Sequence, residues 1–268
     1  MQPKTVYDQS LAPLISEDPV LQRELEYHEK LYSGFAQQHF AKPAVRALRE
    51  NMVRRILSRT GAARQSRVLS IGCGIGDTEL LLAPHVGEVV GIDLSPAAVR
   101  QANADAAKAG VRNFRAHEAR IEEFSDSKPF DAVIAIFFLH HLTDEMLVAC
   151  AAKIRSILTS YGAFYSLDPS RYRLSGYIGE LFFPKIMAQY QSEDERQLAP
   201  GVTRRLFTSA GFPDARASYY DFVSTPLAGL YPSWRAGYRA TRVLDEFLIR
   251  TPGLKLLSSN FEITAIKK

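Results

Sequence analysis

The sequence has 268 residues, of which 46% are hydrophobic and 23% charged, as in a globular chain that can bury a sizeable core. Its net charge of +4 neither demands nor excludes an anionic partner. Two cysteines, Cys73 and Cys150, exclude a disulfide framework, and the longest apolar run, residues 132–139, is too short to span a bilayer. Because the chain also begins without a signal-peptide pattern, we expect a soluble, cytoplasmic protein.

Residues 20–60 are predicted to be helical, because apolar residues recur there at three- and four-residue spacings. Pro43 is expected to start one of these helices and Gly61 to end it. From residue 67 the period changes, and seven segments are predicted to be strands: 67–71, 87–93, 113–119, 130–139, 163–168, 217–223 and 260–268. The last of them alternates in the manner of an edge strand.

Helices are predicted between the strands, one capped by Ser95, one by Thr143 and one, over 203–212, by Thr203. Nearly continuous apolar strands that alternate with helices indicate a parallel sheet buried on both faces. The fold class expected is therefore α/β, with a doubly wound, seven-stranded, mostly parallel sheet.

Three long segments fall outside this pattern, and such segments in a compact domain are usually lids or binding elements. We therefore predict a helical N-terminal cap over 1–60, an inserted lid over 170–202 and a second insertion at about 224–257. Residues 61–169 would form the ligand-binding α/β core, which 203–268 complete around that second insertion.

The stretch "VLSIGCGIGD" ends the first predicted strand in a glycine cluster. A dinucleotide fingerprint needs glycines at 72, 74 and 77, but the third glycine is Gly76 and position 77 is Asp77. A carboxylate at that helix start would repel a pyrophosphate, so a ligand without phosphate is favoured. The plainer alternative is that the glycines only form a tight strand-to-helix turn.

Together, "VLSIGCGIG", "VVGIDLSP" and "FDAVIAIFFLHHL" resemble the class I S-adenosylmethionine-dependent methyltransferases. The resemblance is close over residues 67–168 and extends to 203–223 and 260–268. It implies a Rossmann-like fold, S-adenosylmethionine as cofactor, and metal-independent methyl transfer by in-line displacement. At the position where metal-dependent relatives carry a ligating acid, this chain has Leu139, so no metal is expected.

The resemblance also implies cofactor-binding residues at the strand ends. These are the backbone of Gly72, Cys73 and Gly74 beside the methionine part, Asp93 at the ribose hydroxyls, Leu94 over the adenine, Glu118 with Ala119 at the adenine amino group, and Phe137 near the sulfonium.

Two further cofactor contacts are less regular. Tyr32, on the N-terminal helix, would approach the cofactor's carboxylate or sulfonium, or else only pack within that helix. Ser70 stands where the family often has an acid, so it can orient the loop but supplies no charge for the cofactor's ammonium.

His140 and His141 follow the fourth strand and are the candidates for a general base, because imidazole titrates near neutral pH. The alternative is that they cap the next helix or pack beside the cofactor. Asp168, before Pro169, is expected to start a turn, and the alternative is that it contacts the acceptor or the lid.

The acceptor is expected to be a small metabolite or natural product, held beneath the aromatic, arginine-bearing insertions. A lipid- or polyprenyl-linked acceptor with transient membrane contact stays open, because the second insertion is basic and partly amphipathic. Nucleic acid is not expected, since neither an RNA-binding module nor a dense basic face is visible. A nicotinamide-dependent oxidoreductase and a non-catalytic cofactor-binding protein are the alternatives of other classes, and the oligomeric state stays open.

Overall fold

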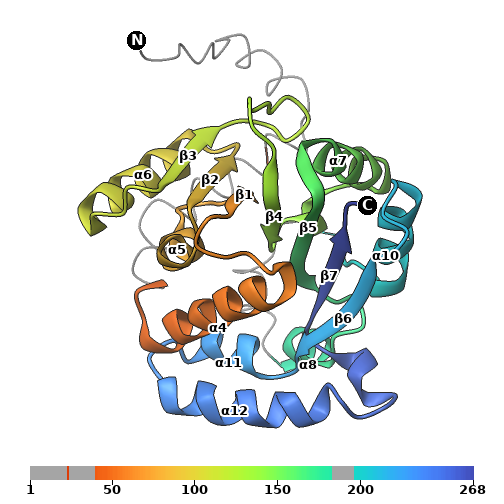
Figure 1. The fold of residues 1–268 in the computed structure, drawn as a ribbon. Helices are drawn as coiled ribbons and strands as arrows, with labels where there is room; N and C mark the ends of the chain where they lie inside the picture. The colour runs from red at the N-terminus through yellow and green to blue at the C-terminus, as the bar shows by residue number, and fades with distance from the viewer. Residues whose placement is uncertain (1–22, 24–39, 183–195) are drawn as a thin grey trace.

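The computed structural model describes residue 23, residues 40–182 and residues 196–268. They form one seven-stranded sheet in the order β3-β2-β1-β4-β5-β7-β6, with helices on both faces (Figure 1). The strands are β1 Arg67–Ile71, β2 Glu88–Asp93, β3 Phe114–Glu118, β4 Phe130–Ile136, β5 Leu158–Pro169, β6 Arg216–Asp221 and β7 Asn260–Ile266. Neighbouring strands pair in parallel, except that β7 is antiparallel to both β5 and β6. The predicted doubly wound, mostly parallel Rossmann-like sheet is confirmed.

Helices connect and cover these strands. They are α4 Pro43–Thr60, α5 Asp77–Leu82, α6 Pro96–Ala109, α7 Asp144–Ile157, α8 Leu174–Phe182, α10 Pro200–Ser209, α11 Ser224–Leu230 and α12 Arg235–Leu248, with short 3-10 helices η2 Ala83–His85, η3 Leu139–His141 and η4 Leu254–Leu257. In the described part of the chain, no helix is both long and apolar enough to cross a membrane.

The predicted helix caps are largely confirmed. Ser95 Oγ accepts the N–H of Ala98, and Thr143 Oγ1 accepts the N–H of Met146. Gly61 ends α4 in the left-handed conformation that a side chain would strain. The start of α10 was predicted wrongly. The helix begins at Pro200, so Thr203 lies inside it and does not cap it.

Two strand predictions are also wrong in detail. β4 ends at Ile136, because Phe137 turns the chain with φ +54°. β7 is not an edge strand, since it lies between β5 and β6 and β6 forms the edge. The alternating polar residue that suggested an edge, Glu262, is fully buried.

Glu262 is buried because α4 supplies two cations to it. Arg55 donates through Nε and Nη2 to the two carboxylate oxygens at 2.6 and 2.7 Å, and Arg59 Nη2 lies 3.1 Å from Oε2. Tyr165 and Ser218 donate their hydroxyls to the same carboxylate at 3.0 and 2.8 Å. A buried carboxylate needs such partners, and here they fasten α4 to the sheet.

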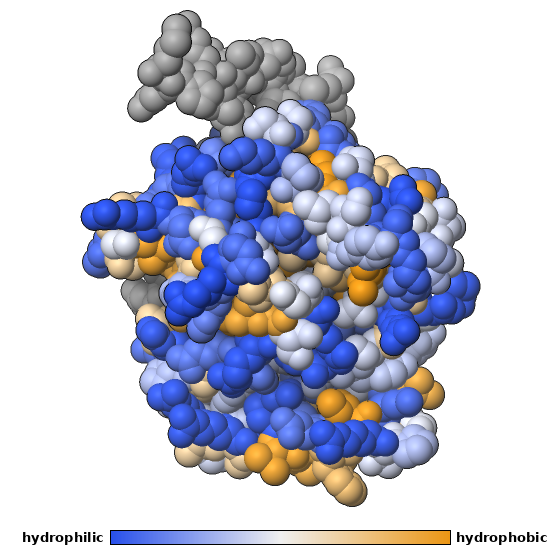
Figure 2. Space-filling view, viewed as in Figure 1, coloured by the Kyte–Doolittle hydropathy of each residue, from blue (hydrophilic) through white to orange (hydrophobic). Residues whose placement is uncertain are grey.

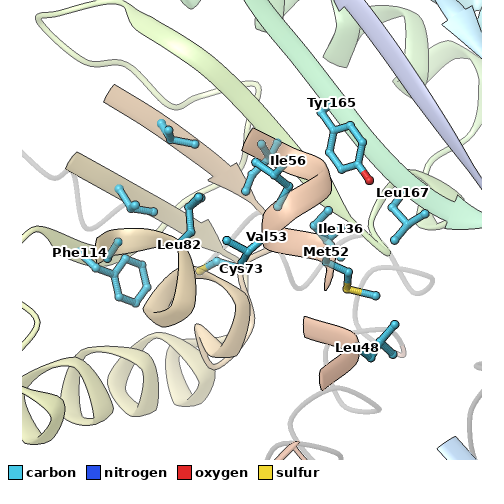
Figure 3. Packing of buried hydrophobic residues seen from close by; sticks show 14 of the residues in the cluster. Leu48, Met52, Val53, Ile56, Cys73, Leu82, Phe114, Ile136, Tyr165 and Leu167 are labelled. Carbon is cyan, nitrogen blue, oxygen red and sulfur yellow. The ribbon is translucent and has the colours of Figure 1, made fainter. Parts of the chain in front are cut away.

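The apolar side of α4 completes this contact. Met52, Val53 and Ile56 face the sheet, where Tyr165 and Leu167 of β5 lie nearby (Figure 3). The second apolar cluster lies on the other face of the sheet, under α7 and α10. The helix α4 therefore packs over the face of the sheet that also carries α5.

The strand order defines where a ligand should bind. From β1 the chain moves outward through β2 to β3, then returns to β4 on the other side of β1. The direction of winding thus reverses between β1 and β4. Open α/β sheets bind ligands at the carboxyl ends of the strands at such a reversal.

Candidate functional site

At the carboxyl end of β1, beside the reversal of winding, the chain makes a turn of glycines in the left-handed conformation. Gly72, Gly74 and Gly76 have φ of +67°, +52° and +76°, values that a side chain would strain. The N–H groups of Gly72 and Cys73 both donate to the carbonyl of Ile92, at 2.8 and 3.1 Å. This places the turn directly beside the end of β2.

Cys73 turns its side chain away from this edge. It is buried, and a Cβ added at Gly91 of β2 would meet its Sγ at 2.7 Å. Burial, with Asp93 nearby, holds the pKa of the Cys73 thiol well above its usual range. The side chain of Cys73 therefore faces the protein interior, and its backbone lies in the glycine turn.

Asp93 ends β2 and joins the two loops at this edge. Its Oδ2 accepts the N–H of Gly74 at 2.8 Å, and its Oδ1 accepts the N–H of Ser95 at 2.9 Å. A carboxylate can accept about four hydrogen bonds, so the two backbone contacts orient Asp93 and leave acceptor sites for a diol. The geometry thus fits a ribose.

The residues predicted to hold the adenine lie next to Asp93. Glu118 is its neighbour in the β2–β3 register, and the N–H of Ala119 donates to the carbonyl of Asp93 at 3.1 Å. Glu118 is exposed, whereas Leu94 and Ala119 are half-buried. The structure brings all four residues to one strand edge.

Glu79, which the sequence analysis missed, brings a carboxylate to Ser70. It lies on α5, is almost fully buried, and its Oε1 accepts the Ser70 hydroxyl at 2.6 Å. Its Oε2 is buried and has no hydrogen-bond partner among the described residues. Burial, with Asp77 nearby, raises the pKa of the Glu79 carboxyl to about 7. A signal was present, because Glu79 shares the buried side of α5 with Leu82, three residues on.

Arg49 of α4 reaches the same loop from above. Its Nε lies 2.5 Å from Asp77 Oδ2, and its guanidinium stands 5.9 Å from the centre of the Phe137 ring. The side chain is largely buried. Because Asp77 and Arg49 neutralise each other at the start of α5, that helix end is not set up for a diphosphate.

His140, just after β4, and Asp168, in β5, form a buried pair on the β4 side of the point where the winding reverses. His140 Nδ1 lies 3.1 Å from Asp168 Oδ1, which also accepts the His140 backbone N–H at 3.3 Å. Asp168 was predicted to start a turn, but it lies within β5 and is fully buried. His141 is half-buried, and its ring centre is 4.1 Å from that of His140.

Tyr32 lies outside the described residues. Among the residues that the structure does describe, no three His, Cys, Asp or Glu side chains are grouped so that they could hold a metal ion.

Comparison with known proteins finds a family match over part of the chain. Residues 68–162 match a family model described as a methyltransferase domain. These residues include the glycine turn, Asp93, and the candidate bases His140 and His141. Over residues 68–162 the chain is therefore similar to methyltransferase domains.

The curated relatives that this chain matches are aligned with it over only part of their length. An uncharacterized methyltransferase, YcgJ, of Bacillus subtilis (strain 168) is 31% identical over 106 residues, which are 39% of this chain and 41% of that protein. A ubiquinone biosynthesis O-methyltransferase of Paracidovorax citrulli is 32% identical over 93 residues, 33% of this chain and 39% of that enzyme. The chain thus matches about two-fifths of the length of these curated relatives.

A solved structure extends the likeness in fold beyond the methyltransferase domain. Magnesium protoporphyrin IX methyltransferase (ChlM) from Synechocystis PCC 6803 with bound SAH aligns with a TM-score of 0.60 and 16% identity. The alignment covers 94% of this chain and all of that one. The likeness in fold therefore includes the C-terminal strands and the helices between them.

Proposed function

We propose that this protein transfers the methyl group of S-adenosylmethionine to a small-molecule acceptor, without a metal. The observation that carries the proposal is Asp93, held by Gly74 and Ser95 at the tip of β2 beside a left-handed glycine turn. Such a carboxylate accepts a ribose diol, whereas a diphosphate would need free positive groups at the start of α5. Asp77 occupies that place, which disfavours the nicotinamide alternative.

The residues present also fit the amino-acid end of this cofactor. Its ammonium needs a buried acceptor, and Glu79 Oε2 is a buried carboxylate oxygen without a described partner. We infer that Glu79, hydrogen-bonded by Ser70, replaces the acid that the family often has at the position of Ser70 itself.

The cofactor, when bound, supplies a methyl group on a positively charged sulfur. Asp93 would hold the ribose, Leu94, Glu118 and Ala119 the adenine, and the backbone of Gly72 and Gly74 with Phe137 the methionine part. The chain's task is then to align the acceptor with the methyl group and to exclude water.

The ribose assignment predicts a large effect of Asp93→Ala. We expect binding of S-adenosylhomocysteine, measured by calorimetry, to weaken more than about tenfold, since a charge-assisted bidentate contact is lost. Asp105→Ala, on the following helix α6, is the matched control and should leave binding unchanged. NADPH should not bind the wild-type protein. Unchanged affinity in Asp93→Ala, or binding of NADPH in its place, would remove the assignment.

His140 is the better candidate for a general base. Asp168 on Nδ1 favours the tautomer in which Nε2 is the accepting nitrogen, and this is the arrangement by which an aspartate orients a catalytic histidine. If an acceptor hydroxyl loses its proton to Nε2 during methyl transfer, His140 carries that proton away.

The two histidines can be separated by mutation. With hydroxyl-bearing ring compounds, including ubiquinone precursors, as an acceptor panel, His140→Ala should lower kcat by about 10²-fold or more with a smaller effect on KM. Asp168→Asn should lower kcat less, and His141→Ala should leave it nearly unchanged. Full turnover in His140→Ala would rule out the base but not methyl transfer.

A lipid- or polyprenyl-linked acceptor is the second candidate. The observation that favours it is the set of exposed aromatic and aliphatic side chains on α8, among them Tyr177, Leu181 and Phe182. Prenylated compounds in the same panel would distinguish it, since a small-molecule enzyme should gain nothing from the prenyl tail.

A further inference from the structure

An apolar strip along α12 is not covered by any of the residues that the structure describes. The helix packs on α4 and α11 at the margin of the molecule (Figure 1). Gly237, Tyr238 and Asp245 form its buried side. On the opposite side, apolar residues recur at three- and four-residue spacings and therefore share one face: Ala236, Ala240, Val243, Leu244 and Phe247.

The strip is unusually exposed for large side chains. Val243 is 73% and Phe247 70% accessible, and Leu244 is also exposed. Single exposed apolar residues need no explanation, but a row of them on one helix face marks an interaction site.

The exposed charges beside the strip are mostly positive. Arg239 precedes Val243 by four residues on α12 and therefore lies beside it, and Arg250, which is also exposed, follows directly after the end of the helix. Residues 234–257 contain five basic and two acidic residues, and one of the basic residues, Arg242, is largely buried and lies 3.8 Å from Asp245. One of these acids, Asp245, is fully buried and accepts the backbone N–H groups of Phe222, Val223 and Ser224. Glu246 is thus the only exposed acid in this stretch.

Aromatic side chains stand at the start of the helix. Trp234 is 55% exposed, and Tyr231 is exposed beside it, the two rings lying edge to face at 6.3 Å. Figure 2 shows hydrophobic patches between hydrophilic ones along the lower margin, where α12 lies in Figure 1. Trp and Tyr favour the boundary between headgroups and acyl chains.

We propose that α12 docks this protein onto an anionic lipid bilayer. Val243 and Phe247 enter the boundary between headgroups and acyl chains, and Arg239 and Arg250 lie at the lipid phosphates. The chemistry favours a bilayer over a protein partner, because one helix side joins an apolar strip to a cationic edge, as in interfacial helices. The proposal is independent of methyl transfer.

The fluorescence of Trp234 can report this contact. Trp234 is the only tryptophan in the sequence and precedes α12 directly. On addition of equimolar phosphatidylcholine–phosphatidylglycerol vesicles, we expect its fluorescence to shift to the blue and the protein to co-sediment. Binding should be at least about fivefold weaker to pure phosphatidylcholine, and it should fall at about 0.5 M salt.

Substitutions in the strip test whether this part of the surface, and no other, binds the vesicles. Val243→Ser/Phe247→Ser should weaken vesicle binding at least about tenfold, and Arg239→Gln/Arg250→Gln should remove the preference for anionic lipid. The matched control is Val202→Ser, an exposed apolar residue on α10, which should bind as the wild type does. Circular dichroism checks that each variant is folded.

Three results would overturn the proposal. The first is no binding of the wild type to anionic vesicles, and the second is equal binding by Val243→Ser/Phe247→Ser. The third is a wild-type oligomer in gel filtration that these two substitutions dissociate, because the strip would then be an interface between copies of the chain. Equal binding to neutral vesicles would overturn the choice of an anionic surface.

Discussion

Glu262→Gln should lower the free energy of unfolding by about 3 kcal/mol, because it leaves two guanidinium groups around a buried site without their counter-charge. The carboxylate is fully buried, and Arg55 and Arg59 are partly exposed, so water can relieve some of the loss. Chemical denaturation monitored by circular dichroism gives the value.

Matched variants test whether the effect belongs to this cluster. Glu50→Gln, on α4 itself, removes partly exposed pairs with Arg46 and Arg235 and should cost less than about 1 kcal/mol. Arg55→Met should cost more than Arg59→Met, because Arg55 makes two parallel hydrogen bonds to Glu262 and Arg59 one. Equal stability of Glu262→Gln and Glu50→Gln would show that the buried cluster does not hold α4.

The same cluster explains what the sequence could and could not predict. Strand positions follow from apolar runs, and helix ends follow from local signals such as Ser95 and Gly61. The contact of Arg55 with Glu262 joins residues 207 apart in the sequence, and no local pattern reports it. Without those arginines, an acid in an alternating strand is typical of a solvent-facing edge, and so β7 was misplaced.

The candidate site divides in the same way. Gly72, Gly74 and Asp93 lie in contiguous motifs, so their convergence could be predicted from the strand pattern. Asp168 could not be recognised as the partner of His140, because Pro169 after it is a turn signal and the contact depends on the β4–β5 pairing. Glu79 was overlooked because the motif directs attention to Ser70, whose hydroxyl supplies no charge by itself.

Cofactor binding should depend on pH through Glu79. In the free protein, burial and the charge of Asp77 raise the pKa of this carboxyl to about 7. The hydrogen bond from Ser70 and the charge of Arg49 act in the opposite direction, and the thiol of Cys73 lies nearby. The cofactor's ammonium would favour the ionised form, so binding should release a proton near and below neutral pH. Between about pH 7.5 and about pH 5.5, we expect affinity for S-adenosylhomocysteine to fall about twentyfold.

Glu79→Gln should weaken binding and abolish most of this pH dependence. Calorimetry in two buffers with different ionisation enthalpies would show proton release in the wild type and not in the variant. Glu118→Gln, an exposed acid at the adenine end, is the matched control and should keep the wild-type slope. A Glu79→Gln protein with the same slope would assign the proton to another group and remove Glu79 from the ammonium site.

The stability of the free protein should change in the opposite direction. Because the folded pKa of Glu79 is raised, its contribution to stability is complete below the unfolded pKa of about 4.5 and is lost as pH rises through about 7. Relative to Glu79→Gln, the wild type should therefore lose up to about 3 kcal/mol between about pH 4.5 and about pH 8. Saturating S-adenosylhomocysteine should remove this loss, since its ammonium compensates the charge that burial disfavours. If the ligand leaves the difference unchanged, Glu79 is a structural acid, and the ribose assignment of Asp93 is unaffected.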